Sequence, residues 1–459
     1  MNEKTSALIT IERILLVVLA ATYLFVVAAF AIQTPDWQAP DEPAHYNYVA
    51  QVAEKGCCPV IEMGDWDLPL LGELTSTRFH PDKLDVLPQV QYEDHQPPLY
   101  YLLASPVYRL SNGDLIAVRL FSVVLGLITV LCSYAAMKTV YPARPYIALA
   151  GAAFIALLPQ HVHIIASVNN DALAEAVIAL TLWQTLRYLR GHRVPLWALG
   201  VLLGIGFITK TTTYYLAAIV PLAVVLHHWQ SGKRDWRGLL RALAFLLIPA
   251  LLIGVVWWLR NIGVYGFPDF LGLRRHDAVV VGQLRTADYI NQVGLGTYVN
   301  QGIRTTLHSF IGQFGWMALP LDDVRILGIS IYSFFYALFG FGISGLILGR
   351  FIPQPEGASS PPRPMLWVLG VMALLSFLAF GYYNTEFLQL QGRYLFPGLI
   401  PIGLGLSYGW AAWWRLLRRL PAIGRYAYSN LLPVGLALVL AFIDMWLLVN
   451  VIVPNLSYS

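Results

Sequence analysis

The stretch Ala39-Pro40-Asp41-Glu42-Pro43-Ala44-His45-Tyr46 organises the expected fold. It places two adjacent carboxylates in a polar segment directly after the first long apolar run, residues 14–32. Such a run is long enough to cross a hydrocarbon core of about 30 Å, which takes roughly 20 helical residues. Asp41 precedes Pro43 by two residues, an arrangement typical of a helix N-cap. We therefore expect a short surface helix from Asp41 to residue 56, with capping as the plain structural role of Asp41.

The composition predicts an all-α polytopic membrane protein. The 459 residues are 57% hydrophobic and 12% charged, with a mean hydropathy of +0.59, whereas soluble proteins average about 25% charged residues. The first apolar run exceeds the roughly 7 to 15 residues of a signal-peptide core, so we expect a retained anchor. The net charge of +4 comes mostly from Lys and Arg in loops, which indicates membrane orientation and not nucleic-acid binding.

Apolar runs predict a bundle of about 11 transmembrane helices. With the N-terminus in the cytoplasm, Lys and Arg fall in every inner loop, which is the positive-inside pattern of the plasma membrane. Two long segments, 33–114 and 260–325, then lie outside with helices at the membrane surface, because loops of this length are uncommon unless functional or disordered. The expected spans are 13–32, 115–137, 146–162, 171–189, 195–209, 212–229, 240–259, 326–349, 365–383, 394–414 and 430–453.

The chain divides into three expected parts. Residues 1–349, with both outer segments, form the proposed catalytic membrane module. Residues 350–364 are rich in Pro, Ser and Gly and predict a cytoplasmic linker. Residues 365–459 form the C-terminal membrane helices.

The cysteines predict no disulfide framework. Cys57 and Cys58 are adjacent, and neighbouring cysteines rarely bridge each other, while Cys132 lies inside an expected span. No Cys or His spacing indicates a resident metal, although a divalent cation shared between the outer loops stays open. Asp444 is the one carboxylate well inside a span, where a functional and a structural role are equally expected.

Lys210, Arg260 and Arg393 are cations at the outer ends of expected spans, where positive charge is normally avoided. Each alone has a plain interpretation as a side chain that reaches the lipid headgroups. Together they surround the face that carries Asp41. A cluster of cations beside an acid is what a phosphate-bearing substrate and a proton acceptor require.

Five short motifs, taken in order, resemble those of the GT-C membrane glycosyltransferases. The broad relatives are protein O-mannosyltransferases and the bacterial aminoarabinose transferases of lipid A, and the nearest resemblance is to a bacterial group of predicted GT-C proteins that share Gln-Gly-Arg-Tyr. The resemblance covers nearly the whole chain, although each motif is short. The motifs are Pro40-Asp41-Glu42, His95-Gln96-Pro97-Pro98-Leu99-Tyr100-Tyr101, Ile208-Thr209-Lys210-Thr211, Arg260-Asn261 and Gln391-Gly392-Arg393-Tyr394-Leu395-Phe396-Pro397.

The resemblance implies a catalytic Asp41, supported by Glu42, and a donor phosphate held by Lys210. Ala44 and Gln96 stand where the aminoarabinose transferases have Arg and Lys. Arg260 or Arg393 is therefore expected to supply part of the phosphate contact. Substrate contacts are expected from His45, His95 and Tyr394.

The expected function is inverting transfer of a sugar from a polyprenyl-phosphate donor, at the outer face of a bacterial plasma membrane. The acceptor is a glycan, a lipid or a protein. One rival is a transporter or flippase, which would need several ionisable groups near the bilayer midplane, where Asp444 stands almost alone. The other rival is a non-catalytic assembly subunit.

Overall fold

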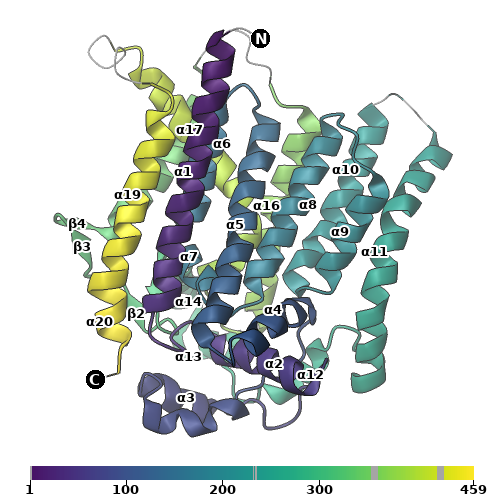
Figure 1. The fold of residues 1–459 in the computed structure, drawn as a ribbon, viewed down its shortest axis with the longest axis vertical. Coiled ribbons are helices and arrows are strands. Elements are labelled where there is room, and N and C mark those ends of the chain that lie inside the picture. Colours follow the sequence, from purple (N-terminus) through teal and green to yellow (C-terminus); the bar gives the residue numbers. More distant parts are fainter. Residues whose placement is uncertain (1–2, 231, 233–234, 353–359, 421–427, 459) are drawn as a thin grey trace.

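A bundle of long helices forms the body of the molecule, in a computed structural model that describes residues 3–230, 232, 235–352, 360–420 and 428–458. The two chain ends lie at opposite ends of this bundle (Figure 1). Its helices are α1 (Glu3–Gln33), α5 (Leu115–Val140), α6 (Pro145–Ala156), α7 (Pro159–Ile165), α8 (Asp171–Leu189), α9 (Leu196–Phe207), α10 (Leu216–Gln230), α11 (Trp236–Tyr265), α15 (Ile331–Leu348), α16 (Arg363–Glu386), α17 (Leu399–Leu417), α19 (Leu431–Leu447) and α20 (Val453–Leu456).

The protein is a multi-pass integral membrane protein. Among the described residues, seven helices are long and apolar enough to span a membrane, and the pair α6 and α7, bent by 62° at its break, raises this to at most eight. Each of the 11 apolar runs predicted from the sequence contains a helix. However, α8, α9 and α10 do not meet the same criterion of length and hydropathy, although they run beside α5 and α11 (Figure 1). A count of 11 spans stays a prediction.

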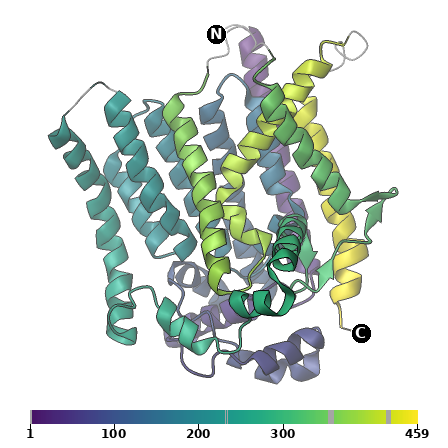
Figure 2. The same ribbon diagram turned by 180° about the vertical axis from the view of Figure 1, so that it is seen from behind.

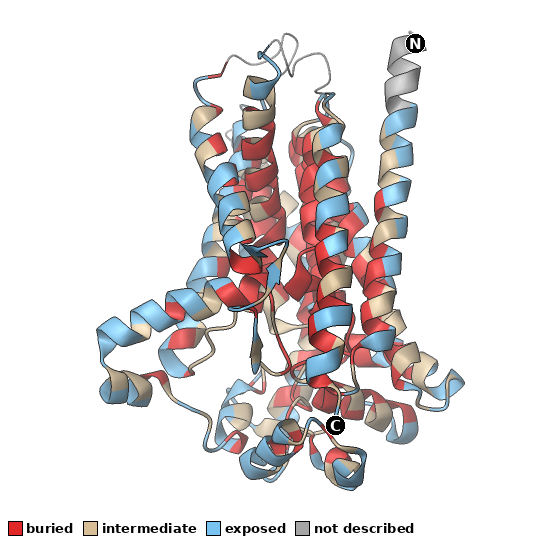
Figure 3. Ribbon diagram, turned by 90° about the vertical axis from the view of Figure 1, so that its left-hand side faces the viewer, coloured by how far each residue is buried: buried red, intermediate tan, exposed pale blue. Residues whose placement is uncertain are grey.

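Large apolar side chains face outward along the bundle, as expected where lipid replaces water. Val17, Phe25 and Leu252 are each about two-thirds exposed. The buried residues run through the interior of the bundle (Figure 3). Two helices meet there through glycines, since a Cβ on Gly409 of α17 would lie 1.8 Å from the carbonyl oxygen of Gly342 in α15. Small residues of this kind allow membrane helices to approach closely.

Two long segments cover the end of the bundle opposite the N-terminus, which we call the distal end (Figures 1 and 2). The first distal segment, residues 34–114, contains four helices, and the predicted helix that begins at Glu42 is confirmed. They are α2 (Glu42–Lys55), α3 (Leu68–Ser76), the 3-10 helix η1 (Pro81–Gln89) and α4 (Leu99–Leu110).

The second distal segment, residues 266–330, contains three helices and two short hairpins. In the first hairpin Gln313 pairs with Pro320, and in the second Arg325 pairs with Ser330. The elements are α12 (Leu273–Val279), α13 (Thr286–Val293), α14 (Leu295–Ile311), β1 (Gln313–Phe314), β2 (Leu319–Pro320), β3 (Arg325–Ile326) and β4 (Ile329–Ser330). The remaining short elements are the 3-10 helices η2 (Thr211–Tyr215) and η3 (Gly392–Gly398) and the π-helix η4 (Leu448–Ile452).

Two other expectations have different outcomes. Cys57 and Cys58 form a disulfide directly after α2, so the prediction that they stay unpaired is wrong. Residues 353–359 of the expected linker, 350–364, lie outside the described residues, and α16 already begins at Arg363.

Candidate active site at the distal end

Asp41 stands at the N-cap position of α2, but its side chain does not cap the helix. Its backbone is left-handed, with φ 67° and ψ −4°, and no cap hydrogen bond is made. Capping residues normally adopt an extended backbone that turns the carboxylate back onto the first helical N–H groups. The predicted capping role is therefore wrong, and the carboxylate is available for other partners.

The carboxylate of Asp41 joins two segments that are distant in sequence. Its Oδ1 accepts a hydrogen bond of 2.9 Å from the Tyr92 hydroxyl, and its Oδ2 forms an ion pair with the guanidinium of Arg393. Burial opposes ionisation of Asp41, but the positive charge of Arg393 and the two hydrogen bonds lower its pKa overall. The carboxylate is thus held in its charged form.

Arg393 is positioned by the glycine before it. A Cβ on Gly392 would lie 2.4 Å from backbone atoms of Thr306 and Phe310 in α14, so only glycine allows this approach. The Arg393 side chain is 5% exposed. Its Nε is buried and has no hydrogen-bond partner among the described residues. A buried guanidinium N–H without a described partner leaves one donor of Arg393 available to a further acceptor.

Lys210 forms the second ion pair of the site. Its Nζ lies 2.6 Å from Oδ1 of Asp171, which is the first residue of α8. Lys210 follows α9 and precedes η2, so two helix ends supply this pair.

His45 links the two ion pairs electrostatically. The pKa of His45 is lowered to about 3, chiefly by burial; Lys210 and Arg393 act in the same direction, and the charges of Asp41 and Asp171 act in the opposite direction. The neutral ring is held by the Tyr101 hydroxyl, 2.8 Å from Nδ1. Because His45 responds to all four charges, the two ion pairs form one cluster. We call Asp41, Asp171, Lys210 and Arg393 the charged cluster.

Glu42 faces a different partner from that of Asp41. It is fully buried and accepts two hydrogen bonds from Arg119, of 2.8 and 2.7 Å, and one from the Val168 N–H. The other Arg119 donors bind the carbonyls of Ala31, Thr34 and Pro35. Glu42 therefore fixes the first distal segment to α1 and α5 and is not open to a substrate.

Arg260 is not brought into the charged cluster. Its guanidinium binds the carbonyl oxygens of Cys58 and Pro59 and also contacts Asn261 and Tyr265. Its described contacts are therefore with the first distal segment and the end of α11. The structure favours a tether between these segments over the expected phosphate contact.

Two further expected residues flank the cluster. The Tyr394 ring centroid lies 5.3 Å from the guanidinium carbon of Arg393. His95 is buried and donates through Nδ1 to the Tyr92 carbonyl at 3.2 Å, and burial and the nearby His276 hold its pKa well below the usual range. His95 is thus a neutral group that positions Tyr92.

Glu93 is a site residue that the sequence interpretation missed. The pKa of Glu93 is raised to about 7, chiefly by burial and then by the charge of Asp41, while Lys210 acts in the opposite direction. Its Oε2 is buried without a hydrogen-bond partner among the described residues. Arg119 was missed as well, although an arginine inside the span 115–137 is a signal for a buried partner. Asp171 was also not among the site residues expected from the sequence.

Several groups lie outside the cluster. Asp444 is fully buried in α19, and neither carboxylate oxygen has a hydrogen-bond partner in the described part of the chain. Across that same part of the chain, no group of three or more His, Cys, Asp or Glu residues is arranged to hold a metal ion.

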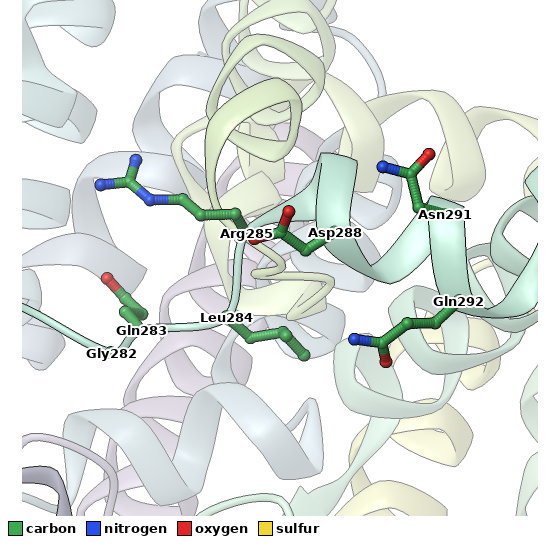
Figure 4. A pocket seen from close by; sticks show the side chains of 7 residues that line it. All are labelled: Gly282, Gln283, Leu284, Arg285, Asp288, Asn291 and Gln292. Carbon is green, nitrogen blue, oxygen red and sulfur yellow. The ribbon is translucent and has the colours of Figure 1, made fainter.

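An open pocket of about 620 Å³ lies in the second distal segment (Figure 4). The predicted site residues do not line it. Its lining contacts the segment that leads to Arg393, because Leu388 N donates a hydrogen bond to the Leu284 carbonyl at 3.1 Å. Its lining is Gly282, Gln283, Leu284, Arg285, Asp288, Asn291 and Gln292.

Part of the chain matches a known protein family. Residues 95–258 match the family model described as dolichyl-phosphate-mannose-protein mannosyltransferase. This region contains Lys210, Asp171 and Arg119 but neither Asp41 nor Arg393. No curated protein is significantly similar to the chain in sequence.

Solved structures of low sequence identity resemble the chain to different degrees. An oligosaccharyltransferase of Archaeoglobus fulgidus, tethered with an acceptor peptide, matches 96% of this chain with a TM-score of 0.52 and 14% identity, and 55% of its own chain is covered. ArnT of Cupriavidus metallidurans bound to undecaprenyl phosphate matches 96% of this chain and 73% of its own at a TM-score of 0.49 and 15% identity. The Pmt1-Pmt2 complex of S. cerevisiae matches 55% of this chain and 34% of its own, with a TM-score of 0.40 and 18% identity.

The chain thus spans about half the length of the oligosaccharyltransferase. The expected resemblance is confirmed at the level of the fold. This protein has the fold of the GT-C membrane glycosyltransferases, and its residues 95–258 match the dolichyl-phosphate-mannose-protein mannosyltransferase family.

Proposed function

We propose that the protein transfers a sugar from a polyprenyl-phosphate donor to an acceptor hydroxyl. The observation that carries this proposal is the buried Arg393, whose Nε lacks a partner among the described residues, in one cluster with Lys210 and the carboxylate of Asp41. Residues 95–258 match a family of enzymes whose sugar donor is a lipid phosphate, and this match supports a polyprenyl-phosphate sugar as the donor.

In this mechanism Asp41 is the general base. It accepts the proton of the acceptor hydroxyl while the hydroxyl oxygen attacks the anomeric carbon. The bond from that carbon to the phosphate oxygen breaks, its electron pair leaves with the lipid phosphate, and the configuration inverts. Lys210 and Arg393 stabilise the charge that grows on the leaving phosphate.

The remaining residues support this reaction. Glu42 and Arg119 hold Asp41 in position, while His45 and Tyr394 contact the substrate. Arg260 tethers the first distal segment to α11.

We also infer the orientation. The distal end faces the outside of a bacterial plasma membrane, the N-terminus is cytoplasmic, and α8, α9 and α10 also cross the membrane. The positive-inside pattern of the loops supports this arrangement. Single cysteines in a background without the native three test it. Ser76→Cys in intact cells should react with an impermeant thiol reagent, and His192→Cys should react only after lysis.

Transfer itself is tested with purified protein in lipid vesicles and polyprenyl-phosphate donors carrying a radiolabelled sugar. Label should move to an acceptor fraction and depend on Arg393 and Lys210. Movement of intact donor lipid between leaflets without transfer would instead identify a flippase.

A further inference from the structure

Both cations proposed to hold the donor phosphate are already paired with carboxylates. Lys210 binds Asp171 and Arg393 binds Asp41, and the four side chains are between 5% and 24% exposed. The two positive and two negative charges cancel. A phosphate that binds these cations closely competes with a carboxylate for the positive charge of each.

The cations also have donors to spare. Arg393 Nε is buried without a partner in the described residues, and Asp171 is the one hydrogen-bond partner described there for Lys210 Nζ, which carries three N–H groups. An arginine fork binds a carboxylate and a phosphate with similar geometry. The same donors can therefore serve either anion.

We propose that Asp41 and Asp171 occupy the places of the donor's phosphate oxygens and exchange with them when the donor binds. The inference rests on the proposed function and adds Asp171 as a positioning residue, which keeps Lys210 in place without donor. Arg393 passes from the Asp41 carboxylate to the phosphate, and Lys210 passes from Asp171 to the phosphate.

This exchange prepares the base. A phosphodiester donor adds one negative charge to a cluster that was neutral, so a carboxylate is left without its cation. Asp41 loses the guanidinium that held it in its charged form and gains affinity for a proton. It can then accept the proton of the acceptor hydroxyl, and donor must bind before the acceptor is activated.

The test measures binding of undecaprenyl phosphate to the full chain in lipid nanodiscs. Asp41→Asn and Asp171→Asn remove a competing charge at nearly constant size. Each should tighten binding about 5-fold or more, the usual lower range for coupled sites. In a transfer assay Asp171→Asn should also lower the donor KM. The matched control is Asp322→Asn, because Asp322 pairs with Arg304 away from the cluster and should leave the affinity unchanged.

Equal or weaker binding by both cluster variants would overturn the exchange. If Asp41→Asn does not fold, Asp171→Asn decides the question alone. The proposed function fails separately: the parent would then not bind the lipid, or Lys210→Ala and Arg393→Ala would bind it as well as the parent does.

Discussion

Asp41 and Glu42 are neighbours, and each pairs with an arginine, but their surroundings differ. The side chains of Glu42 and Arg119 are 0% and 1% exposed, and protein groups fill every donor of that guanidinium. The side chain of Asp41 is 24% exposed, and Arg393 keeps a buried N–H without a described partner. A pair that protein satisfies completely holds the fold together, whereas an incompletely satisfied pair keeps a donor for a further acceptor.

The largest expected effect separates the two carboxylates by activity. Asp41→Asn should reduce sugar transfer by roughly 10² to 10⁴, because an amide cannot accept the acceptor proton at neutral pH. Transfer from a defined lipid donor in vesicles measures this. Asp322→Asn is the control for loss of a carboxylate at the distal end. A near-parental rate for Asp41→Asn would place the base elsewhere, with Glu93 as the next residue to change.

The second effect is a difference in stability between variants of Glu42 and Asp41. Glu42→Gln should destabilise the protein by about 3 to 5 kcal/mol, because it leaves Arg119 charged and buried without its counter-ion. Thermal unfolding in detergent measures the loss. Asp41→Asn should cost less, since its pair is partly open to water. If the two variants unfold at the same temperature, the distinction between the closed and the open pair is lost.

The third effect compares three cations. Lys210→Ala and Arg393→Ala should each weaken binding of undecaprenyl phosphate by roughly 10- to 100-fold, the equivalent of charge-assisted hydrogen bonds of about 1.5 to 3 kcal/mol. Arg260→Ala should change the affinity little, because its guanidinium is engaged by the carbonyls of Cys58 and Pro59. An equal loss in all three variants would return Arg260 to the phosphate site.

The smallest effect concerns Glu93 and pH. Its folded pKa of about 7 lies above its ordinary value. Below both values Glu93 carries a proton in both states and contributes nothing to the pH dependence. As the pH rises to about 7 the unfolded chain ionises first, so the folded state loses stability. Glu93→Gln cannot ionise, and its unfolding temperature relative to the parent should rise between pH 5 and pH 8. A constant difference would show that Glu93 is solvated.

The sequence predicts local features of this molecule better than distant pairings. The apolar runs and the start of α2 follow from hydropathy and from Pro43, and both are found in the structure. Lys210 and Arg393 were singled out because positive charge is rare at those ends of spans. Their partners were not predicted, since Arg393 lies 352 residues from Asp41 and no local pattern encodes such contacts.

The left-handed backbone conformation of Asp41 was not predicted from the sequence either. Asp before a proline-containing helix start normally predicts a cap, and the left-handed conformation reverses that expectation. The disulfide between Cys57 and Cys58 was not predicted, because adjacent cysteines rarely form one. For Asp41, contacts with Tyr92 and Arg393 take the place of the local capping preference.

The left-handed backbone of Asp41 has a practical consequence for chemical complementation. Glycine adopts this conformation freely, whereas it raises the energy of most other residues. Asp41→Gly should therefore remove the carboxylate without straining the chain and leave Arg393 facing a small void. Exogenous formate is the size of the missing group and carries its charge. The Asp41→Gly variant should therefore take its base from solution, and its turnover should depend on the concentration of added formate.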